Sequence, residues 1–232
     1  MKQFFRFSIM LLALLLPALT YAHDFKVDSI YYNRINDNEV EVTYGQIFDH
    51  RYQYHGAVTI PAAVTYDGTT YSVTSIGEGA FLRCPRLTSV VIPNSVTSIG
   101  NEAFMNCWML ADVYCYIADL SGVSCGNEQF YKEYNGDYSG RTLHVLQGTA
   151  DAYRADKNWY PYFGQIVDDL KPDVPGDVNG DSEVNIADVN AVINMILGGN
   201  DDNTAADVNG DGEINIADVN AIINIILTGS WN

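Results

Sequence analysis

Beyond Lys171 the chain contains no lysine or arginine. The same stretch contains eleven acidic residues, so it carries eleven of the seventeen net negative charges of the chain. Such a segment repels itself unless cations neutralise it, and it also repels the phosphate backbone of a nucleic acid. The missing positive charge therefore argues against a nucleic-acid partner and predicts that cations bind to this tail.

Long hydrophobic runs are also scarce. The only sustained run, from Ile9 to Leu16, is too short to cross a bilayer, which requires about 20 apolar residues. It follows two basic residues and precedes a short segment that ends at Ala22, which is the order of a secretory signal peptide. We therefore expect residues 1–22 to be removed, leaving a secreted protein of the extracellular space or bacterial cell surface with no membrane span. The residue directly after the expected cleavage site is His23 and not a cysteine, so we expect no lipid anchor.

Catalytic signatures are missing as well. The four histidines, His23, His50, His55 and His144, lie in unrelated contexts without metal-ligand spacing. The one G-x-S-x-G match, at residues 122–126, lacks the strand-turn-helix pattern that would support a nucleophile, and no cysteine has a recognisable partner motif. We therefore predict that the protein is not an enzyme and interpret the histidines as surface or capping residues.

Cysteine is limited to Cys84, Cys107, Cys115 and Cys125. Export to an oxidising compartment allows disulfides, and four cysteines can pair in three ways, among which the sequence does not choose. Cys84 and Cys107 occupy equivalent places in a repeat, so burial as small apolar residues is at least as good an interpretation.

That repeat has a period of 23 residues. The segments VTSIGEGAFLRCPRLTSVVI from Val73 and VTSIGNEAFMNCWMLADVYC from Val96 are identical at 10 of 20 positions. Each unit contains a Leu-x-x-Val strand, a second extended piece ending in Ile-Gly, and an Ala-Phe-x-x-Cys segment that predicts a short helical turn. One unit cannot bury its apolar positions alone, so the units must stack as a solenoid with a continuous core.

The repeat resembles the BspA-type leucine-rich repeat, whose pattern has the same order of Ile-Pro, Val, Ile-Gly, Ala-Phe, Cys, Leu and Val. The resemblance implies a short solenoid over residues 58–171. A looser first unit starts at Val58 and contains an inserted turn at residues 66–69. Residues 117–141 fit no unit well, so we expect a degenerate rung or a loop there.

Both ends of the solenoid should be capped. Upstream, in residues 23–57, two alternating segments flank Asn36-Asp37-Asn38, which predicts a hairpin. Downstream, residues 142–145 predict one more strand and residues 149–153 a capped short helix.

Residues 172–176, Pro-Asp-Val-Pro-Gly, break any helix and predict a linker. A second repeat then follows with an offset of 30 residues. The segments DVNGDSEVNIADVNAVINMIL from Asp177 and DVNGDGEINIADVNAIINIIL from Asp207 are identical at 17 of 21 positions.

Each copy has oxygen-bearing side chains at loop positions 1, 3, 5, 9 and 12, which is the spacing of an EF-hand calcium loop. Calcium prefers six to eight oxygen ligands, and the backbone carbonyl at position 7 completes the set. The predicted ligands are Asp177, Asn179, Asp181, Glu183, Asn185 and Asp188 in the first loop, and Asp207, Asn209, Asp211, Glu213, Asn215 and Asp218 in the second. We expect two calcium ions, whose main role is to let the acidic tail fold. The alternative is that the loops are only polar turns.

Two positions depart from the standard loop. Position 12 is Asp instead of the usual Glu, and position 6 is Ser182 in the first loop but Gly212 in the second. Glycine adopts the left-handed turn without steric cost. We therefore expect the first loop to bind calcium more weakly.

An amphipathic helix pattern follows each loop. Its apolar positions are Val189, Val192, Ile193, Ile196 and Leu197, repeated as Val219, Ile222, Ile223, Ile226 and Leu227. No helix can precede the first loop, because Pro172 and Pro175 lie there.

A calcium loop with only its exiting helix, present twice, resembles the type I dockerin over residues 177–227. The resemblance implies a small all-α domain at residues 177–232, with the two helices packed as an antiparallel pair. It also implies a cohesin-like partner that reads loop positions 10 and 11. In this chain those positions are Ile186-Ala187 and Ile216-Ala217. The isoleucines either pack inward or stay exposed as anchors.

Aromatic residues gather near the end of the solenoid. They are Phe130, Tyr131, Tyr134, Tyr138, Trp159, Tyr160, Tyr162 and Phe163. Such rings can stack on sugars or anchor a protein partner. A solenoid must bury its last apolar rung, however, so we favour packing in the terminal cap.

The predicted fold class is α+β, with a leucine-rich repeat solenoid followed by a dockerin-like domain. The favoured function is a secreted, non-catalytic adhesion protein. Its repeats would bind a protein or polysaccharide, and its tail would dock to a cohesin-like partner, in the dockerin family often within a polysaccharide-degrading assembly. One alternative is a subunit of a carbohydrate-processing enzyme. Another is a tail that serves only as an intramolecular, calcium-stabilised cap.

Overall fold

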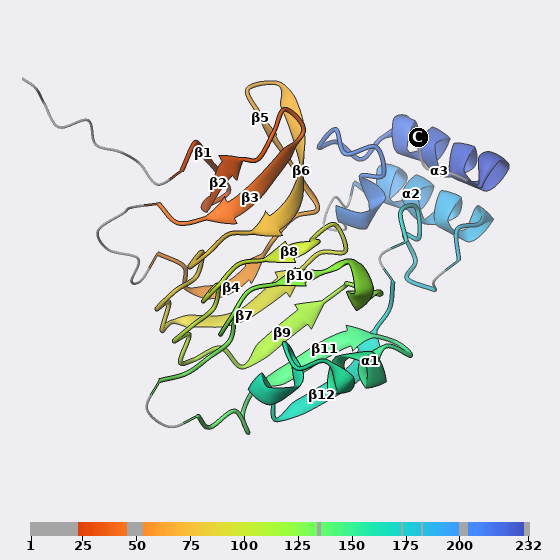
Figure 1. Cartoon of the computed structure of the whole chain (residues 1–232). Coiled ribbons are helices and arrows are strands. Elements are labelled where there is room, and N and C mark those ends of the chain that lie inside the picture. Colours follow the sequence, from red (N-terminus) through yellow and green to blue (C-terminus); the bar gives the residue numbers. More distant parts are fainter. Residues whose placement is uncertain are drawn as a thin grey trace, which may run out of the picture.

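The computed structural model of the chain describes residues 23–45, 53–133, 136–172, 174–181, 183–199 and 204–229. The predicted signal peptide lies outside these residues. Within them, no helix is long and apolar enough to cross a membrane. The described strands form two sheets, followed by a pair of helices at the C-terminal end (Figure 1).

One sheet is built from the Leu-x-x-Val strands of the repeat. Its order is β12-β11-β9-β7-β4, and every neighbouring pair is parallel. The strands are β4 (Gly56–Thr59), β7 (Leu87–Ile92), β9 (Asp112–Cys115), β11 (Thr142–Leu146) and β12 (Gln165–Leu170). Val90, Val113 and Leu143 lie in register and are buried. Alternate residues of these strands therefore form one wall of the core.

The other sheet begins antiparallel and becomes parallel. Its order is β1-β2-β3-β6-β8-β10, with β5 paired to β6. The strands are β1 (Phe25–Val27), β2 (Ile30–Arg34), β3 (Glu39–Thr43), β5 (Ala63–Tyr66), β6 (Thr69–Ile76), β8 (Ser98–Ile99) and β10 (Ser124–Cys125). The predicted hairpin around residues 36–38 is confirmed by the antiparallel pairing of β2 and β3. The predicted turn at residues 66–69 joins β5 to β6, and Asp67 and Gly68 both have positive φ there.

A column of stacked aromatic rings runs through the solenoid core. Tyr54, Phe81, Phe104 and Phe130 follow one another with ring centroids 4.4, 4.8 and 4.9 Å apart. Phe81 and Phe104 are fully buried. The turns that carry them also join neighbouring rungs, because the Phe81 amide donates to the Ala103 carbonyl and the Phe104 amide to that of Gln129. These turns are hydrogen-bonded but are not helical, so that detail of the prediction was wrong.

Residues 117–141 contain a rung that the repeat pattern only partly indicated. Strand β10 pairs in parallel with β8, and the amide of Asn106 donates to the Tyr131 carbonyl. A short 3-10 helix, η1 (Leu120–Gly122), precedes β10. Phe81 and Phe104 are 23 residues apart, whereas Phe104 and Phe130 are 26 apart. The longer spacing hides the repeat in the sequence, yet the ring of Phe130 still stacks on the column.

Strands β11 and β12, helix α1 (Ala150–Ala155) and the 3-10 helix η2 (Tyr160–Tyr162) close the solenoid. The predicted strand and short helix are confirmed, but Thr149 makes no side-chain cap bond and its hydroxyl donates to the Leu146 carbonyl. Trp159 and Phe163 are buried, which confirms packing in the cap, whereas Tyr160 is exposed. Tyr134 lies outside the described residues.

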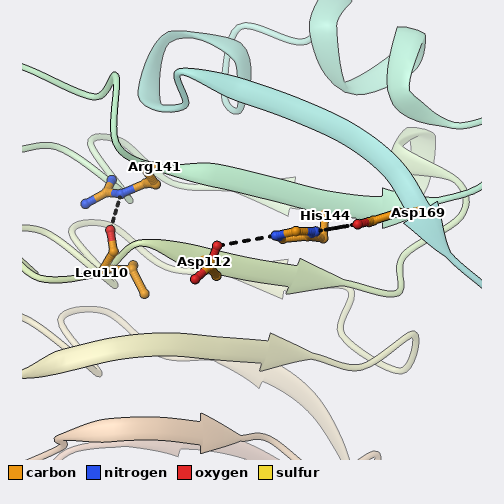
Figure 2. A network of polar contacts seen from close by, with 5 residues as sticks. All are labelled: Leu110, Asp112, Arg141, His144 and Asp169. Atoms are coloured by element: carbon orange, nitrogen blue, oxygen red, sulfur yellow. Dashed lines mark hydrogen bonds and ion pairs between the residues drawn. The ribbon is translucent and has the colours of Figure 1, made fainter.

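Arg141 is a fully buried arginine that covers the end of the rung stack. Its guanidinium donates to three backbone carbonyls, those of Leu110 at 3.2 Å, Phe130 at 2.7 Å and Cys107 at 3.2 Å. Figure 2 shows the bond to Leu110. Burial lowers the pKa of Arg141 to about 10. The side chain therefore joins the carbonyls of Cys107 and Leu110 to that of Phe130, which belongs to the next rung.

The four cysteines all lie among the described residues, and no disulfide joins them. Cys84, Cys107 and Cys115 are buried, and the Cys107 thiol donates to the Phe81 carbonyl. Burial raises the pKa of Cys115 and of Cys125 to about 11. Of the two interpretations open from the sequence, small buried residues describe Cys84 and Cys107.

The acidic tail folds around a separate apolar core. Helices α2 (Ile186–Gly198) and α3 (Ile216–Thr228) pack against each other, and Figure 1 shows them side by side. A short 3-10 helix, η3 (Thr204–Ala206), precedes the second loop. The buried residues are Val178, Val189, Val192, Ala206, Val208, Val219 and Ile222. Among the described residues none of these belongs to the solenoid core.

Candidate calcium loops and docking surface

The first loop turns its polar side chains onto its own backbone. One carboxylate oxygen of Asp177 accepts from the amides of Gly180 at 2.8 Å and Asp181 at 3.0 Å. Asn179 accepts from the Asp181 amide and donates to the Asp181 carboxylate, at 2.8 and 2.9 Å. Asp181 in turn accepts from the Glu183 amide at 2.9 Å. The side chains at loop positions 1, 3 and 5 are therefore held within one turn.

The end of the loop and the start of α2 use the same two residues. Asp188 is fully buried and accepts from the amides of Val178 at 2.8 Å, Asn179 at 3.0 Å and Asn185 at 2.9 Å. Asn185 is the N-cap of α2 and accepts from the Ala187 amide at 2.8 Å. Together Asn185 and Asp188 form a capping box. A short Asp at position 12 thus closes the loop directly onto its backbone.

The second loop repeats this arrangement. Asp207 accepts from the amides of Asp211 at 3.1 Å and Gly212 at 2.9 Å. Asp218 accepts from the amides of Asn209 at 3.1 Å and Asn215 at 2.8 Å, and it is fully buried like its counterpart. Ser182, which the ranking of the two loops depends on, lies outside the described residues, so that ranking stays a prediction.

The donor chemistry of both loops suits a hard cation. Carboxylates, amide oxygens and carbonyls are the ligands that calcium prefers, and a carboxylate has about four acceptor sites, so the backbone bonds orient these groups without using all their capacity. Among the described residues, no group of three or more His, Cys, Asp and Glu side chains is arranged as a metal site. The two ligand sets therefore remain predictions that depend on loop spacing and donor type.

The isoleucines at loop position 10 are exposed. Ile186 keeps 66% of its surface exposed and Ile216 keeps 65%. Ala187 is also exposed, and Ala217 is half-buried. Inward packing of the two isoleucines is thus wrong, and their near-equal exposure shows that the two units present them alike.

The apolar stripe of each helix is only partly covered. Val192 and Ile222 are fully buried, but Leu197 is 80% exposed and Leu227 is 78% exposed. The helix pattern predicted an apolar stripe along each helix, and the last turn of that stripe is exposed. The pattern records where apolar side chains lie on a helix, but it does not show where the neighbouring helix stops.

The two helices run in opposite directions at their contact. A β-carbon placed on Gly176, just before the first loop, would lie 3.1 Å from Val184 and 3.0 Å from Ile225. Val184 immediately precedes the N-cap of α2, whereas Ile225 lies in the last turns of α3. The start of one helix therefore lies beside the end of the other, as expected for an antiparallel pair.

His144 takes part in a polar network that the sequence did not indicate. Figure 2 shows His144 on β11 between Asp112 on β9 and Asp169 on β12. Its Nε2 lies 3.3 Å from Asp112 and its Nδ1 lies 2.9 Å from Asp169. Its ring stacks on Tyr114 with centroids 4.5 Å apart. Both ring nitrogens face carboxylates, so His144 cross-links three parallel strands. His50 lies outside the described residues.

Rungs of parallel strands with a capping layer, followed by two loop-helix units, define a repeat protein with a second domain of paired helices. The model of the BspA type leucine-rich repeat region (6 copies) matches residues 65–135. The model of the dockerin type I domain matches residues 175–227. The chain therefore contains a BspA-type leucine-rich repeat region and a C-terminal type I dockerin domain, and its fold class is α+β.

Several solved structures resemble the repeat region. A leucine-rich repeat protein from Bacteroides capillosus ATCC 29799 is 25% identical, with 52% of this chain and 96% of that chain covered and a TM-score of 0.36. A leucine rich cell surface protein from Faecalibacterium prausnitzii A2-165 is 24% identical, with 62% and 42% covered and a TM-score of 0.37. A leucine-rich repeat protein from Bacteroides ovatus ATCC 8483 is 23% identical, with 62% and 53% covered and a TM-score of 0.32. The chain thus spans about half the length, or less, of the Faecalibacterium prausnitzii and Bacteroides ovatus proteins. No curated protein matches it significantly.

The two matched modules have known general properties. Type I dockerin domains bind calcium and dock to cohesins, and leucine-rich repeats bind proteins. Both modules are typically non-catalytic and belong to extracellular or cell-surface proteins. The chain therefore combines two binding modules.

Proposed function

We propose that this chain is a secreted, non-catalytic adhesion protein whose tail docks to a cohesin-like receptor while its repeats hold a protein or polysaccharide ligand. In this arrangement residues 23–57 form the N-terminal cap, residues 58–171 the solenoid, residues 172–176 the linker and residues 177–232 the docking domain. The setting is an extracellular assembly, such as one that degrades polysaccharides.

The observation that carries the proposal is the matched exposure of Ile186 and Ile216. Exposing an isoleucine side chain to water is unfavourable. An exposed apolar residue that occurs twice at equivalent places therefore favours a contact with a partner. Receptor binding would bury these side chains in apolar pockets, as anchors of an interface commonly are. Ala187 and Ala217 would lie beside them at the same interface.

Calcium in each loop would supply the charge that the tail lacks. The proposed ligands are Asp177, Asn179, Asp181, Asn185 and Asp188 with the Glu183 carbonyl, and the equivalent residues Asp207, Asn209, Asp211, Asn215 and Asp218 with the Glu213 carbonyl. Because Asn185 and Asp188 also form the capping box of α2, an ion in the loop would stabilise the start of the helix that presents Ile186. Docking should therefore depend on calcium through the shape of the tail.

A panel of purified cohesin modules on a sensor surface tests this proposal. The full chain should bind at least one module in calcium and dissociate on adding a chelator. An Asp177→Ala, Asp207→Ala double variant should not bind, whereas an Asp168→Ala variant, which alters an exposed acid outside both loops, should bind normally. Binding that persists in chelator would contradict the proposal. A glycan array and a hydrolase screen on the same protein separate adhesion from carbohydrate processing, because only the second predicts turnover.

A further inference from the structure

Lys171 connects the repeat region to the first loop. It directly follows β12, where the Leu170 carbonyl accepts from the Gln147 amide at 3.0 Å and Leu170 pairs with Leu146 of β11. Its ammonium group donates to the Gly180 carbonyl at 2.7 Å. The backbone before Lys171 is thus fixed on the solenoid, while its side chain is fixed on loop position 4.

This contact leads directly to the first predicted calcium ligand. The amide of Gly180 donates to the Asp177 carboxylate at 2.8 Å, so a single residue separates the ammonium group from the position 1 carboxylate. Lys171 is also the last basic residue of the chain. It therefore places the nearest positive charge in the sequence beside a loop whose side chains are acidic.

The surrounding interface is loosely filled. A groove of about 570 Å³ lies between the two parts, with Pro61, Pro93 and Tyr116 on the solenoid side and Lys171, Asp177 and Gly180 on the tail side. The bond from the Lys171 ammonium group to the Gly180 carbonyl is a specific contact between two residues that line this groove.

The second loop has no equivalent of this lysine. The two loops are offset by 30 residues, which places Asp201 at the position that corresponds to Lys171. Asp201 lies outside the described residues, but its charge is opposite. Two loops of nearly the same sequence therefore differ in the charge of the residue that precedes them by six positions.

We propose that Lys171 is a positioning residue that acts as an internal counter-ion for the first loop and holds it in its folded form, against the solenoid, before calcium binds. The inference deepens the proposed function, since it rests on calcium binding by both loops. The first loop is then partly organised in the absence of the ion, and the second loop depends on calcium alone. The docking domain accordingly folds onto the repeat region from its first loop outward.

Hydrogen exchange of the full chain in chelator tests the proposal on the loop segments 177–185 and 207–215. Lys171→Met should speed exchange of the first segment by about threefold to fivefold, as expected for a solvent-exposed, charge-assisted bond, and leave the second segment unchanged. Lys171→Arg should restore the slower exchange, because it keeps the charge. Lys157→Met removes an exposed lysine elsewhere and should change neither segment.

Equal exchange of the first segment in wild type and Lys171→Met would overturn the proposal, and so would an equal acceleration of both segments. Adding calcium tests the proposed function separately. Calcium should protect both segments in every variant. If it protects neither, the calcium proposal fails, while the chelator comparison still decides whether Lys171 positions the first loop.

Discussion

Two single residues would determine how a receptor recognises the proposed docking surface. Ile186 and Ile216 begin their helices at equivalent places and are almost equally exposed. Because the helices also form an antiparallel pair, the tail presents nearly the same surface twice. A receptor that recognises one isoleucine can then bind in either of two orientations.

This symmetry predicts that single substitutions are masked. Ile186→Asp or Ile216→Asp alone should weaken receptor binding only by a statistical factor of about two, or ~0.4 kcal/mol. The double variant should lose binding while calcium affinity and helix content persist. Titration calorimetry with the receptor measures the affinities, and circular dichroism checks the fold. A single variant that abolishes binding with its fold intact would rule out two orientations.

The two loops should also differ in calcium affinity. Position 6 is Ser182 in the first and Gly212 in the second, and Gly212 adopts a φ of 87°, a left-handed conformation that favours glycine. Asp207→Ala should therefore cost more total calcium affinity than Asp177→Ala, because it removes the better site. Calorimetric calcium titrations of the two variants measure this, and equal losses would count against the ranking.

For single residues, the sequence predicted the structural role of those that recur in each repeat unit and missed the role of those that occur once. The repeat placed Phe81, Phe104 and Cys107 in the core because each occupies a conspicuous position of a 23-residue unit. His144 occurs once, and its two carboxylate neighbours come from two other strands, so only the fold reveals the network. The exposure of Leu197 depends on how far the contact between α2 and α3 extends, which helix periodicity does not contain.

Among the elements, the turns of the solenoid carry the rings of the aromatic column. Each places one aromatic ring on a shared column, so each ring contacts the rungs on both sides. Removing a ring leaves a cavity that rigid neighbouring strands cannot close. Stability should therefore be most sensitive at these turns.

Phe81→Ala and Phe104→Ala test this sensitivity. Each should lower the free energy of unfolding by ~3–5 kcal/mol, as expected for a fully buried aromatic residue. Met109→Ala removes an exposed apolar side chain of the same region and should change stability by less than about 0.5 kcal/mol. Chemical denaturation followed by fluorescence provides the comparison. A loss below about 1 kcal/mol at both phenylalanines would contradict a continuous column.

The C-terminal cap should be indispensable for solubility. Residues 142–170 supply β11, which pairs with the edge of β9, and Trp159, which packs against Phe130 at the end of the aromatic column. Deleting them exposes that rung and an unpaired parallel edge, so the truncated chain should aggregate. Light scattering after purification measures this outcome. A soluble, monomeric truncation would show that the rung is covered in another way.

Element boundaries were predictable wherever local patterns were strong. The hairpin around residues 36–38 and the cap strand at residues 142–145 follow from alternation and turn residues. Strand β1 was not anticipated, and residues 117–141 were left open as a degenerate rung or a loop. β1 has only three residues, and the three extra residues between Phe104 and Phe130 remove the regular spacing on which repeat detection depends.

The whole molecule consists of two cores with different requirements for folding. The solenoid core contains large aromatic and aliphatic residues, whereas the tail core is small and surrounded by acidic loops. The tail is therefore the part whose folding should depend on an ion. Its charge pattern indicated this before any geometry was known.

A fragment of residues 173–232 should be largely unfolded in chelator and gain helix as calcium is added. The fragment lacks Lys171, so neither loop has an internal counter-ion, and eleven carboxylates remain unneutralised. Circular dichroism at 222 nm during a calcium titration measures the change, and magnesium at the same concentration is the control, since its octahedral preference suits these loops poorly. Unchanged dichroism with calcium would disprove ion-dependent folding.

Arg141 has a consequence for how such arrays change in length. Its guanidinium donates to three carbonyls of the last two rungs, those of Cys107, Leu110 and Phe130. These contacts do not depend on the number of rungs that come before them. A duplicated 23-residue unit inserted between Val73 and Val96 would preserve every contact of Arg141. The length of the repeat region can therefore change by duplication of a unit, while β12 still leads through Lys171 to the first loop.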